Sequence, residues 1–525
     1  MTTASPTSVA IIGAGHNGLV AGVILARAGL RVTVIEAAET PGGCLWTETD
    51  ATGVRVERGA IDHGGAAAIA DELGLERFGL DYLERDDVLG VAFGNGEVRR
   101  FAVDAHDTAA GLGSDGEAYL ELVEMAQSFF GMLDAFPVPP TMTTLASTLS
   151  SLRGGDETFR LLLSSAEAVL ERRLTDRAVR GSLELYAAHG QVPPFITGSG
   201  LFALLLPSSH GHRAVRPTGG SGAFVAALVA ALEAAGGTLV TGAAVTSIVE
   251  RAGRPTVRMG GEELSVDRVV STVDVKRLAT LLEEPPPGLL RAARGVTSGR
   301  FNISELTVSL AGVSPFDLGP VGKSSAVWFA QDEYGDLRSS FGRVIAGQLP
   351  ERPWSMVAHG LQDQGIEGGS VWLSSIVPLK PEWGEWSADD EQRAADRVVA
   401  GVSHVLGVDL ASQSQQRWVS GPRVWSTRLR GDGNPNHLDQ TIDQLMGWRP
   451  PGMAGHRSER GWLYLSGSGT HPGGGLSGTS GRAVAAAVLD DLAGRRVGRS
   501  PGVVAEVKGL FAAFRSYRAM RGGAQ

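Results

Sequence analysis

An α/β fold that begins with a dinucleotide-binding unit is predicted by three features of this 525-residue sequence. The first is an apolar run over residues 9–12 that ends in glycine, as a short buried strand does. The second is a Gly-x-Gly-x-x-Gly segment at residues 13–18, followed by a helical pattern over residues 19–28. The third is another strand, residues 31–36, that ends in an acidic residue. Together these features form the layout that binds a dinucleotide.

Each glycine of this segment has its own physical role. Gly13 permits the tight turn, Gly15 lets backbone amides approach a diphosphate, and Gly18 allows the helix to pack closely on the strand. The diphosphate also meets the positive end of the helix dipole. Glu36 lies where a carboxylate can accept hydrogen bonds from a ribose diol. A glycine-rich turn alone would also suit another α/β unit, but the strand, helix and acid together favour nucleotide binding.

The glycine pair Gly42 and Gly43 indicates which dinucleotide is bound. In flavoproteins with two dinucleotide-binding folds, an acid followed shortly by Gly-Gly lets the chain pass close to FAD. An ordinary NAD dehydrogenase has no need of this element. No second complete glycine motif follows a strand elsewhere, so no separate NADPH domain is predicted. We therefore expect FAD as the cofactor, with NADPH left open as a reductant that has no recognisable domain of its own.

Composition and charge exclude several classes of function. The chain has 47 basic and 57 acidic residues and a net charge of -10, which disfavours nucleic acid as a partner. The single cysteine, Cys44, excludes a disulfide framework, a Cys-x-x-Cys pair and a cysteine-rich metal site. No metal-binding motif is evident either. The sequence shows neither a secretion signal nor a spanning apolar run, so we expect a cytoplasmic protein.

Four sequence blocks follow one another along the chain. They are the first glycine motif with its acid and glycine pair, residues 217–224, residues 431–450 and residues 461–482. In this order they resemble the phytoene desaturase (phytoene dehydrogenase) branch of the FAD-dependent amine-oxidase-like superfamily. The His16-Asn17 form of the first block is similar to bacterial phytoene-dehydrogenase-like proteins and their animal relatives. The fourth block is long and specific, with a second glycine-rich loop that opens a helix.

The resemblance implies a two-dinucleotide-binding-fold flavoprotein: a Rossmann-like FAD domain with an interleaved α+β substrate domain. The expected FAD domain is discontinuous and comprises residues 1–75, 210–285 and 455–495. The expected substrate domain comprises residues 76–209 and 286–454. The expected cofactor contacts are Gly13, Gly15, His16, Asn17, Gly18, Glu36, Gly42, Gly43, Gly219, Gly220, Val245, Gly467, Gly469, Gly474, Gly475, Leu476 and Gly478. Taken without the family, the turn at Gly219 and Gly220 would suit a surface loop equally well.

Residues for acid–base chemistry and substrate contact are harder to select. The catalytic candidates are His471, His437 and His212. The substrate candidates are Tyr186, His189 and Asp439. Three of them have a structural alternative, because His471 can simply fix its loop, and His437 and Asp439 can cap the helix that follows. Tyr186 and His189 lie in a segment that resembles the family's substrate-cavity lining. Cys44 replaces an arginine or small residue often found after the glycine pair; covalent flavin attachment is conceivable, but a small buried apolar role is favoured.

The function that the resemblance implies is hydride transfer between flavin and an extended apolar, polyene-like substrate, by desaturation, isomerisation or reduction. An alternative is a cyclase of natural product biosynthesis that reductively cyclises a polyene tetramate macrolactam. Divergence over residues 46–65 argues against choosing carotenoids by default. Amine oxidation is less favoured, because the fourth block lacks the appearance of an aromatic cage. A third possibility is a non-catalytic prenyl- or lipid-binding escort protein of the GDP-dissociation-inhibitor type, against which the complete glycine motifs argue.

Other segments carry weaker expectations. Residues 120–133 and 161–185 are predicted as helices, and residues 321–329, 371–377 and 419–429 as containing strands. The C-terminal tail, residues 496–525, is basic and has an amphipathic pattern. Such a helix can lie on a membrane surface, although a contact with the acidic surface of the protein itself or with a partner subunit is favoured. The expected ligand is a lipophilic small molecule.

Overall fold

The computed structural model describes residues 6–51, 53–136, 138–314, 318–319, 321, 327–334, 336–359 and 369–495. The predicted basic tail, residues 496–525, lies outside the described residues, so its membrane or subunit contact stays a prediction. Within the described ranges, no helix is long and apolar enough to cross a membrane.

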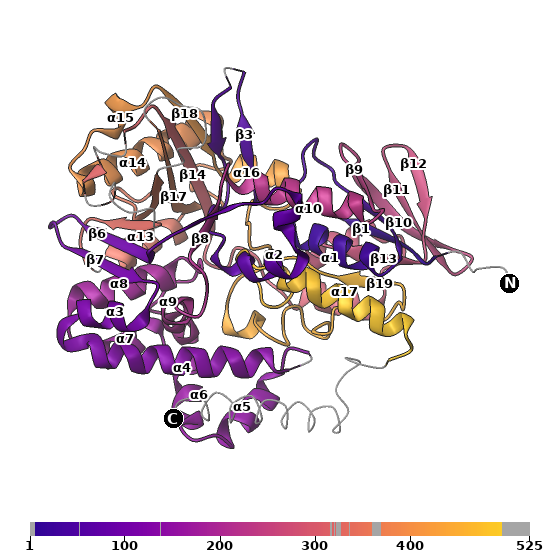
Figure 1. Cartoon of the computed structure of the whole chain (residues 1–525), viewed down its shortest axis with the longest axis horizontal. Coiled ribbons are helices and arrows are strands. Elements are labelled where there is room, and N and C mark those ends of the chain that lie inside the picture. Colours follow the sequence, from indigo (N-terminus) through magenta and orange to yellow (C-terminus); the bar gives the residue numbers. More distant parts are fainter. Residues whose placement is uncertain are drawn as a thin grey trace.

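A five-stranded parallel sheet forms one half of the molecule (Figure 1). Its strand order is β19-β13-β1-β2-β9, so the first strand of the chain lies at the centre. These strands are β1 (Ser8–Ile12), β2 (Arg31–Ile35), β9 (Thr238–Val240), β13 (Arg268–Ser271) and β19 (Leu463–Leu465). The central strand is buried along its whole length, as expected of a parallel strand covered on both faces.

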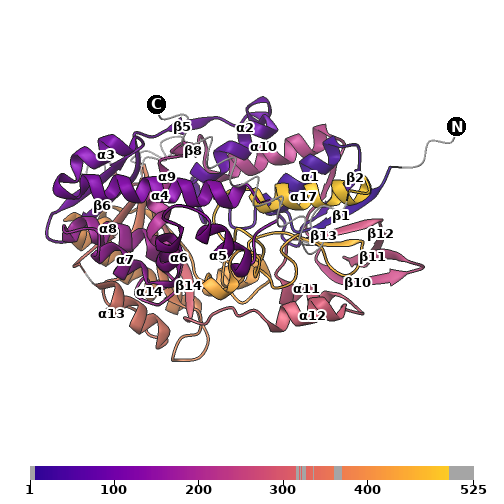
Figure 2. The ribbon, with the colours of Figure 1, turned by 90° about the horizontal axis from the view of Figure 1, so that it is seen from below.

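Alternate residues of β1 enter two different cores. Val9 and Ile11 pack against α1 (His16–Arg27), α10 (Ser221–Ala234) and α17 (Thr479–Leu492). Ala10 and Ile12 face the opposite core, which contains α11 (Val275–Leu281), α12 (Pro287–Arg294) and a three-stranded antiparallel sheet. That sheet comprises β10 (Val245–Arg251), β11 (Arg254–Met259) and β12 (Glu262–Ser265), and it projects at one end of the molecule (Figure 2).

A seven-stranded mixed sheet forms the other half, in the order β18-β14-β17-β16-β15-β6-β7. The strands are β6 (Asp87–Phe93), β7 (Val98–Ala102), β14 (Ile303–Ala311), β15 (Trp328–Gln331), β16 (Ser355–His359), β17 (Ser370–Pro378) and β18 (Gln416–Ser420). One face packs against α14 (Ala388–Leu406). The other face packs against the helices of residues 105–209.

The helices of the second half are mostly short. They are α3 (Ala105–Gly111), α4 (Gly116–Asp134), α5 (Met142–Ser150), α6 (Gly155–Leu163), α7 (Ala166–Glu171), α8 (Arg177–Ala188), α9 (Leu205–Ser209), α13 (Asp336–Ile345), α15 (Leu410–Gln413) and α16 (Pro422–Leu429).

The prediction of one helix over residues 161–185 is wrong. Ser165 and Asp176 each begin a new helix by accepting hydrogen bonds from backbone amides of its first turn. The predicted strand at residues 321–329 is described only from Trp328 onward. Of residues 419–429, only the first two belong to a strand, and most of the rest form the helix α16.

The two halves are interleaved along the chain. All five strands of the parallel sheet come from the segments predicted to form the FAD domain, and all seven of the mixed sheet from those predicted to form the substrate domain. Two pairs of short strands lie between the halves: β3 (Thr47–Thr49) with β4 (Arg55–Glu57), and β5 (Tyr82–Glu84) with β8 (Val215–Pro217). Hydroxyls of Thr307 and Ser309 on β14 donate to backbone oxygens at Arg58 and Glu57. The exact segment bounds stay a prediction.

Candidate functional site

A cavity of about 570 Å³ lies between the parallel sheet and the mixed sheet. Its size falls within the usual range for small-molecule and cofactor sites. One arm begins at the carboxyl ends of β1 and β2, beside Glu36 and Val245. It continues past the start of α1 and the loop before α17 to a second arm that is lined by β16, β17 and α4. The position at the carboxyl ends of parallel strands is the usual one for ligands in α/β sheets.

The first glycine turn has the backbone geometry that its sequence predicts. Gly13 has a φ of +99°, and a Cβ there would lie 2.2 Å from Thr272 Oγ1. A Cβ at Gly18 would lie 2.1 Å from the Gly13 carbonyl oxygen. At Gly15 a Cβ would meet nothing within 4 Å, so the start of α1 opens directly on the cavity. Two of the glycines are therefore required for packing, and the third leaves space for a ligand.

The adenosine end of the predicted site is built from Glu36 and the loop that follows it. The Glu36 carboxylate accepts hydrogen bonds from the amides of Ala14 (2.8 Å) and Ala38 (2.9 Å). The amide of Gly42 donates to the Ala14 oxygen (2.8 Å), which holds the loop against the glycine turn. Gly43 then passes so close that its Cβ would lie 3.3 Å from the Gly15 Cα. Only a glycine-rich chain can follow this path.

The fourth block forms a second glycine loop on the opposite side of the start of α1. Gly467 has a φ of +89°, and a Cβ there would lie 2.5 Å from the Thr272 oxygen. Gly475, at φ +94°, has open space beside it. A Cβ at Gly474 would lie 1.8 Å from Asn436 Oδ1, so this loop also packs against the third block. The loop therefore lies between the start of α1 and the third block.

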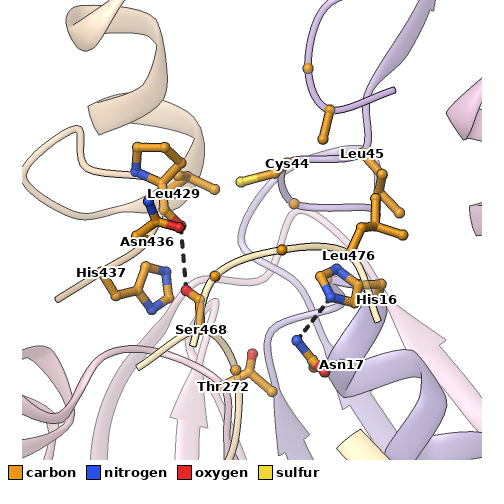
Figure 3. A pocket seen from close by; sticks show the side chains of 18 of the residues that line it. His16, Asn17, Cys44, Leu45, Thr272, Leu429, Asn436, His437, Ser468 and Leu476 are labelled. Carbon is orange, nitrogen blue, oxygen red and sulfur yellow. Dashed lines mark hydrogen bonds between the residues drawn. The ribbon is translucent and has the colours of Figure 1, made fainter. Parts of the chain in front are cut away.

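Two of the predicted catalytic histidines line the cavity. His437 and His471 come from the third and fourth blocks, and the Nδ1 of each is buried without a hydrogen-bond partner in the described part of the protein. Burial lowers the pKa of His471 to about 4 and lowers that of His437. Burial likewise lowers the pKa of His16 to about 4, and its Nε2 accepts from Asn17 Nδ2 at 2.9 Å (Figure 3). These imidazoles are therefore neutral at pH 7.

Most of the predicted cofactor residues line this one cavity. They are Gly13, Gly15, His16, Asn17, Gly18, Glu36, Gly43, Val245, Gly467, Gly474, Gly475 and Leu476, and the substrate candidate His189 joins them. Gly42, Gly219, Gly220, Gly469 and Gly478 do not line it. A Cβ at Gly220 would lie 1.9 Å from Glu57 Oε1, so the turn of the second block packs against β4. Gly478, at φ +70°, is the residue before α17 and packs on Ile69.

Three other predicted residues also lie outside the cavity wall. His212 is exposed. The Tyr186 ring lies 6.2 Å from that of Phe329, and its hydroxyl faces Ser209 Oγ at 3.4 Å. The Asp439 carboxylate accepts from Thr297 Oγ1 (2.6 Å) and the Gly299 amide (2.8 Å), so it fixes a turn. None of these three side chains lines the cavity, so their predicted contacts with substrate or flavin stay predictions.

Arg449 was not predicted as a site residue, yet it organises the third and fourth blocks. It is fully buried, and burial lowers its pKa to about 10. Its guanidinium donates to the backbone oxygens of Ser468, Asp439 and Asn436, each at 2.9 Å, and to two more at 3.3 Å. The block around it was visible in the sequence, but no pattern there indicates that the arginine binds backbone oxygens. It holds the loop of His437 against the loop of His471.

The second arm of the cavity was also missed. Its apolar lining comes from separate parts of the chain: Phe130, Leu133, Leu201, Phe202, Leu205, Met356, Trp372, Trp425, Leu429, Leu445 and Met446. A carboxylate, Glu305 on β14, also faces this region and accepts from Ser374 Oγ at 2.5 Å. Apolar residues that line a cavity have the same periodicity in sequence as those of a core. No sequence signal separates the two cases.

Cys44 lies at the junction of the two arms. Its sulfur points into the cavity, toward Leu429 and Asn436 (Figure 3). Burial raises the pKa of the thiol to about 12, so it is protonated at pH 7 and is a weak nucleophile. The expected role of a small apolar residue agrees with this protonation state, although the side chain faces the cavity and not a packed core.

A parallel sheet with a glycine turn, a terminal acid and a second glycine loop around one elongated cavity defines a dinucleotide-binding flavoprotein. The family model of the flavin containing amine oxidoreductases matches residues 18–489, so the chain belongs to that family. It is therefore an FAD-dependent oxidoreductase, and the predicted α/β fold and family resemblance are confirmed.

Two curated relatives are similar over nearly the whole chain. One is hydroxyneurosporene desaturase of Rubrivivax gelatinosus, 26% identical over 516 residues, with 92% of this chain and 93% of the relative covered. The other is pyridine nucleotide-disulfide oxidoreductase domain-containing protein 2 of Mus musculus, 24% identical over 553 residues, with the same coverage. A solved structure of a putrescine oxidase variant aligns with a TM-score of 0.63 at 18% identity, over 93% of this chain and 99% of that one. The last likeness shows the fold alone.

The residues around the cavity fit FAD. The open space at Gly15 and the free amide end of α1 suit a diphosphate, and Glu36 with Val245 suits the adenosine half. The unpartnered imidazole nitrogens of His437 and His471 provide polar groups where the flavin half would extend toward the second arm. Bound FAD supplies hydride transfer; the protein supplies binding, orientation and exclusion of water.

Proposed function

We propose that the protein transfers hydride between FAD and a carbon of an extended, mostly apolar substrate, in a desaturation, an isomerisation or a reduction. The observation that carries this proposal is the second arm, because it is continuous with the cofactor arm and is lined mainly by aliphatic and aromatic side chains. An extended apolar ligand would bury its surface there with a free energy of about 25 cal/mol per Å². The name of the bacterial relative, a desaturase of hydroxyneurosporene, supports the same reaction class.

The chain's own residues would orient this substrate and exclude water. Trp372 and Met356 form part of the apolar wall from the mixed sheet, and Phe202 forms part of it from the helical layer. His437 and His471, neutral at pH 7, can each donate or accept one hydrogen bond beside the reacting region. Glu305 is the carboxylate on β14 that faces the cavity, so it can hold or accept a proton there.

A second candidate is reductive cyclisation of a polyene that carries a polar ring, as in a tetramate macrolactam. The observation that favours it is a group of polar side chains beside the apolar arm: His189, Gln191, Asn436 and Gln440. Asn436 Nδ2 donates to Gln191 Oε1 at 2.8 Å, so the group is already partly ordered. A hydrocarbon gains nothing from such groups, whereas carbonyl or amide functions can be hydrogen-bonded by them.

The test is anaerobic spectroscopy of the purified yellow protein. Desaturation is supported if a polyene hydrocarbon bleaches the flavin band and NADPH does not. Bleaching by NADPH, followed by recovery of the flavin band on addition of an oxygenated polyene, would support the reductive candidate and a role for NADPH. If only amines bleach the flavin, the hydride-transfer proposal for apolar substrates is wrong.

A further inference from the structure

Trp46 contacts two arginines that differ in their hydrogen-bond partners. The guanidinium carbon of Arg58 is 4.5 Å from the indole centroid, and that of Arg428 is 4.4 Å from it. Arg58 binds Glu48 (2.6 Å), Ser420 Oγ (3.0 Å) and the Val419 oxygen (2.9 Å), so its nitrogens are all occupied. The stack fixes both guanidinium planes, because a cation held over an indole face is stabilised there.

Arg428 differs from Arg58 because it lines the cavity and lacks an anion. Its Nε donates to the Gly43 oxygen at 2.7 Å, and its other nitrogens make only contacts of 3.4 and 3.5 Å to Thr40 Oγ1 and the Pro41 oxygen. It forms no ion pair with any carboxylate in the part of the chain that the structure describes. Burial lowers the pKa of Arg428, although Glu36 and Glu48 act in the opposite direction without forming an ion pair with it.

The position of Arg428 indicates the anion that would pair with it. Its Nε is bound to Gly43, and Gly43 lies against Gly15 at the open start of α1. That start is where a helix binds phosphate through its free amides. A planar guanidinium with free donors is the side chain best suited to bind phosphate in a bidentate manner. Cys44, beside Gly43, leaves this loop without a cation of its own.

We propose that Arg428 binds the diphosphate of FAD, so that the cofactor site of the parallel-sheet half is completed by a cation from α16 of the mixed-sheet half. Cofactor binding then stabilises the contact between the two halves. The helix dipole and amides of α1 would hold the diphosphate on one side, and Arg428 would neutralise it from the other. Trp46 and the Gly43 oxygen hold the guanidinium in place before FAD arrives, which reduces the entropy lost on binding.

The test compares FAD binding by the full-length apoprotein in the wild type and in Arg428→Met, Arg428→Lys and Arg58→Met, measured by flavin fluorescence at several KCl concentrations. Met fills similar space without charge. We expect Arg428→Met to raise the Kd for FAD by about tenfold to a hundredfold, as for loss of a charge-assisted hydrogen bond. Its Kd should also depend less on salt than that of the wild type, because one screened ion pair is gone. Arg428→Lys should lose less affinity and keep the wild-type salt dependence.

Arg58→Met is the matched control, because it removes the other guanidinium from the same indole without touching the cavity wall. Its Kd should stay within about threefold of the wild type. The proposal is overturned if Arg428→Met binds FAD within about twofold of the wild type. It is equally overturned if Arg428→Met and Arg58→Met lose the same affinity with unchanged salt dependence, since the arginine would then only pack. If Arg428→Met does not fold, Arg428→Gln, which is also neutral, replaces it in the same comparison of Kd and salt dependence.

Discussion

Asn17 Oδ1 accepts a hydrogen bond from the backbone amide of Gly481 at 3.1 Å. The bond joins the first turn of α1 to the first turn of α17, which lie side by side although they come from opposite ends of the described chain. A Cβ at Gly481 would lie only 2.3 Å from the backbone oxygen of Asn17, so the two helices touch through backbone atoms. Both glycine loops of the cofactor arm are thereby held at a fixed separation.

Replacement of Asn17 by Ala should destabilise the protein, because it leaves the buried Gly481 amide without its acceptor. We expect the free energy of unfolding to fall by about 1–3 kcal/mol, measured by urea denaturation of the FAD-loaded protein. Gln127→Ala, at an exposed position of α4, is the control and should change stability by less than about 0.5 kcal/mol. Equal stability of Asn17→Ala and the control would show that the contact contributes nothing.

Two glycines of the same turn should fail in different ways when a side chain is added. Gly15→Val should fold, because Gly15 has a φ of -68° and its Cβ would meet nothing within 4 Å. The valine would project into the cavity, so the protein should be colourless. Gly18→Val should fold poorly, because its Cβ would lie 2.1 Å from the Gly13 oxygen. Circular dichroism and bound flavin per chain separate the outcomes; a yellow Gly15→Val protein would contradict the placement of FAD.

Arg449→Met should be strongly destabilising although Arg449 touches no cofactor atom in the proposed site. The change removes one buried cation, and it leaves backbone oxygens of the third and fourth blocks without their donor. Each orphaned buried acceptor costs about 1–3 kcal/mol, so a total loss of more than about 3 kcal/mol is expected. Thermal unfolding measures it. A loss of less than about 1 kcal/mol would show that water replaces the guanidinium.

Ionisation of Glu57 should lower the free energy of unfolding as the pH rises. It is buried, and burial raises its pKa from 4.5 to about 7, while Thr47 Oγ1 and the Ser221 amide donate to one carboxyl oxygen. Because the folded pKa is the higher one, the stabilising contribution is complete below pH 4.5 and is lost as the pH rises through about 7. Glu57→Gln is neutral throughout, so its advantage over the wild type should grow by roughly 1–3 kcal/mol across this range.

The readout is the difference in free energy of unfolding between Glu57→Gln and the wild type at matched pH. Subtraction removes the contribution of all other titrating groups. Parallel stability curves for the two proteins would mean that Glu57 ionises normally in the folded state.

The part of the site predicted from the sequence is the part that backbone geometry dictates locally. Gly13, Gly15 and Gly18 could be placed because strand, turn and helix are consecutive, and each glycine has one steric reason to be there. Gly219 and Gly220 have the same appearance in sequence, yet Gly219 lies beside Arg55 and Gly220 packs against Glu57, because the partner of the turn is a distant strand. The same limit applies to Arg449, whose acceptors are backbone oxygens that carry no sequence signature.

The helices of the second half were predicted less well for a related reason. Residues 161–185 have a continuous apolar pattern, but Ser165 and Asp176 redirect the chain by capping new helices. The apolar arm of the cavity needs contributions from helices, strands and loops far apart in the sequence. Its shape follows from tertiary packing, which a one-dimensional pattern does not contain.

The order of the strands in the parallel sheet has a consequence for biosynthesis. β19 pairs with β13, and α17 packs on α1. The last described strand and helix therefore complete the sheet and the helical layer to which β1 and α1 belong. A ribosome must therefore release nearly all of these residues before the cofactor loop at Gly467 and the start of α17 exist. Until then the apolar strand β1 lacks the part of its cover that α17 provides. The complete cofactor site therefore exists only after nearly all of the described chain has been synthesised.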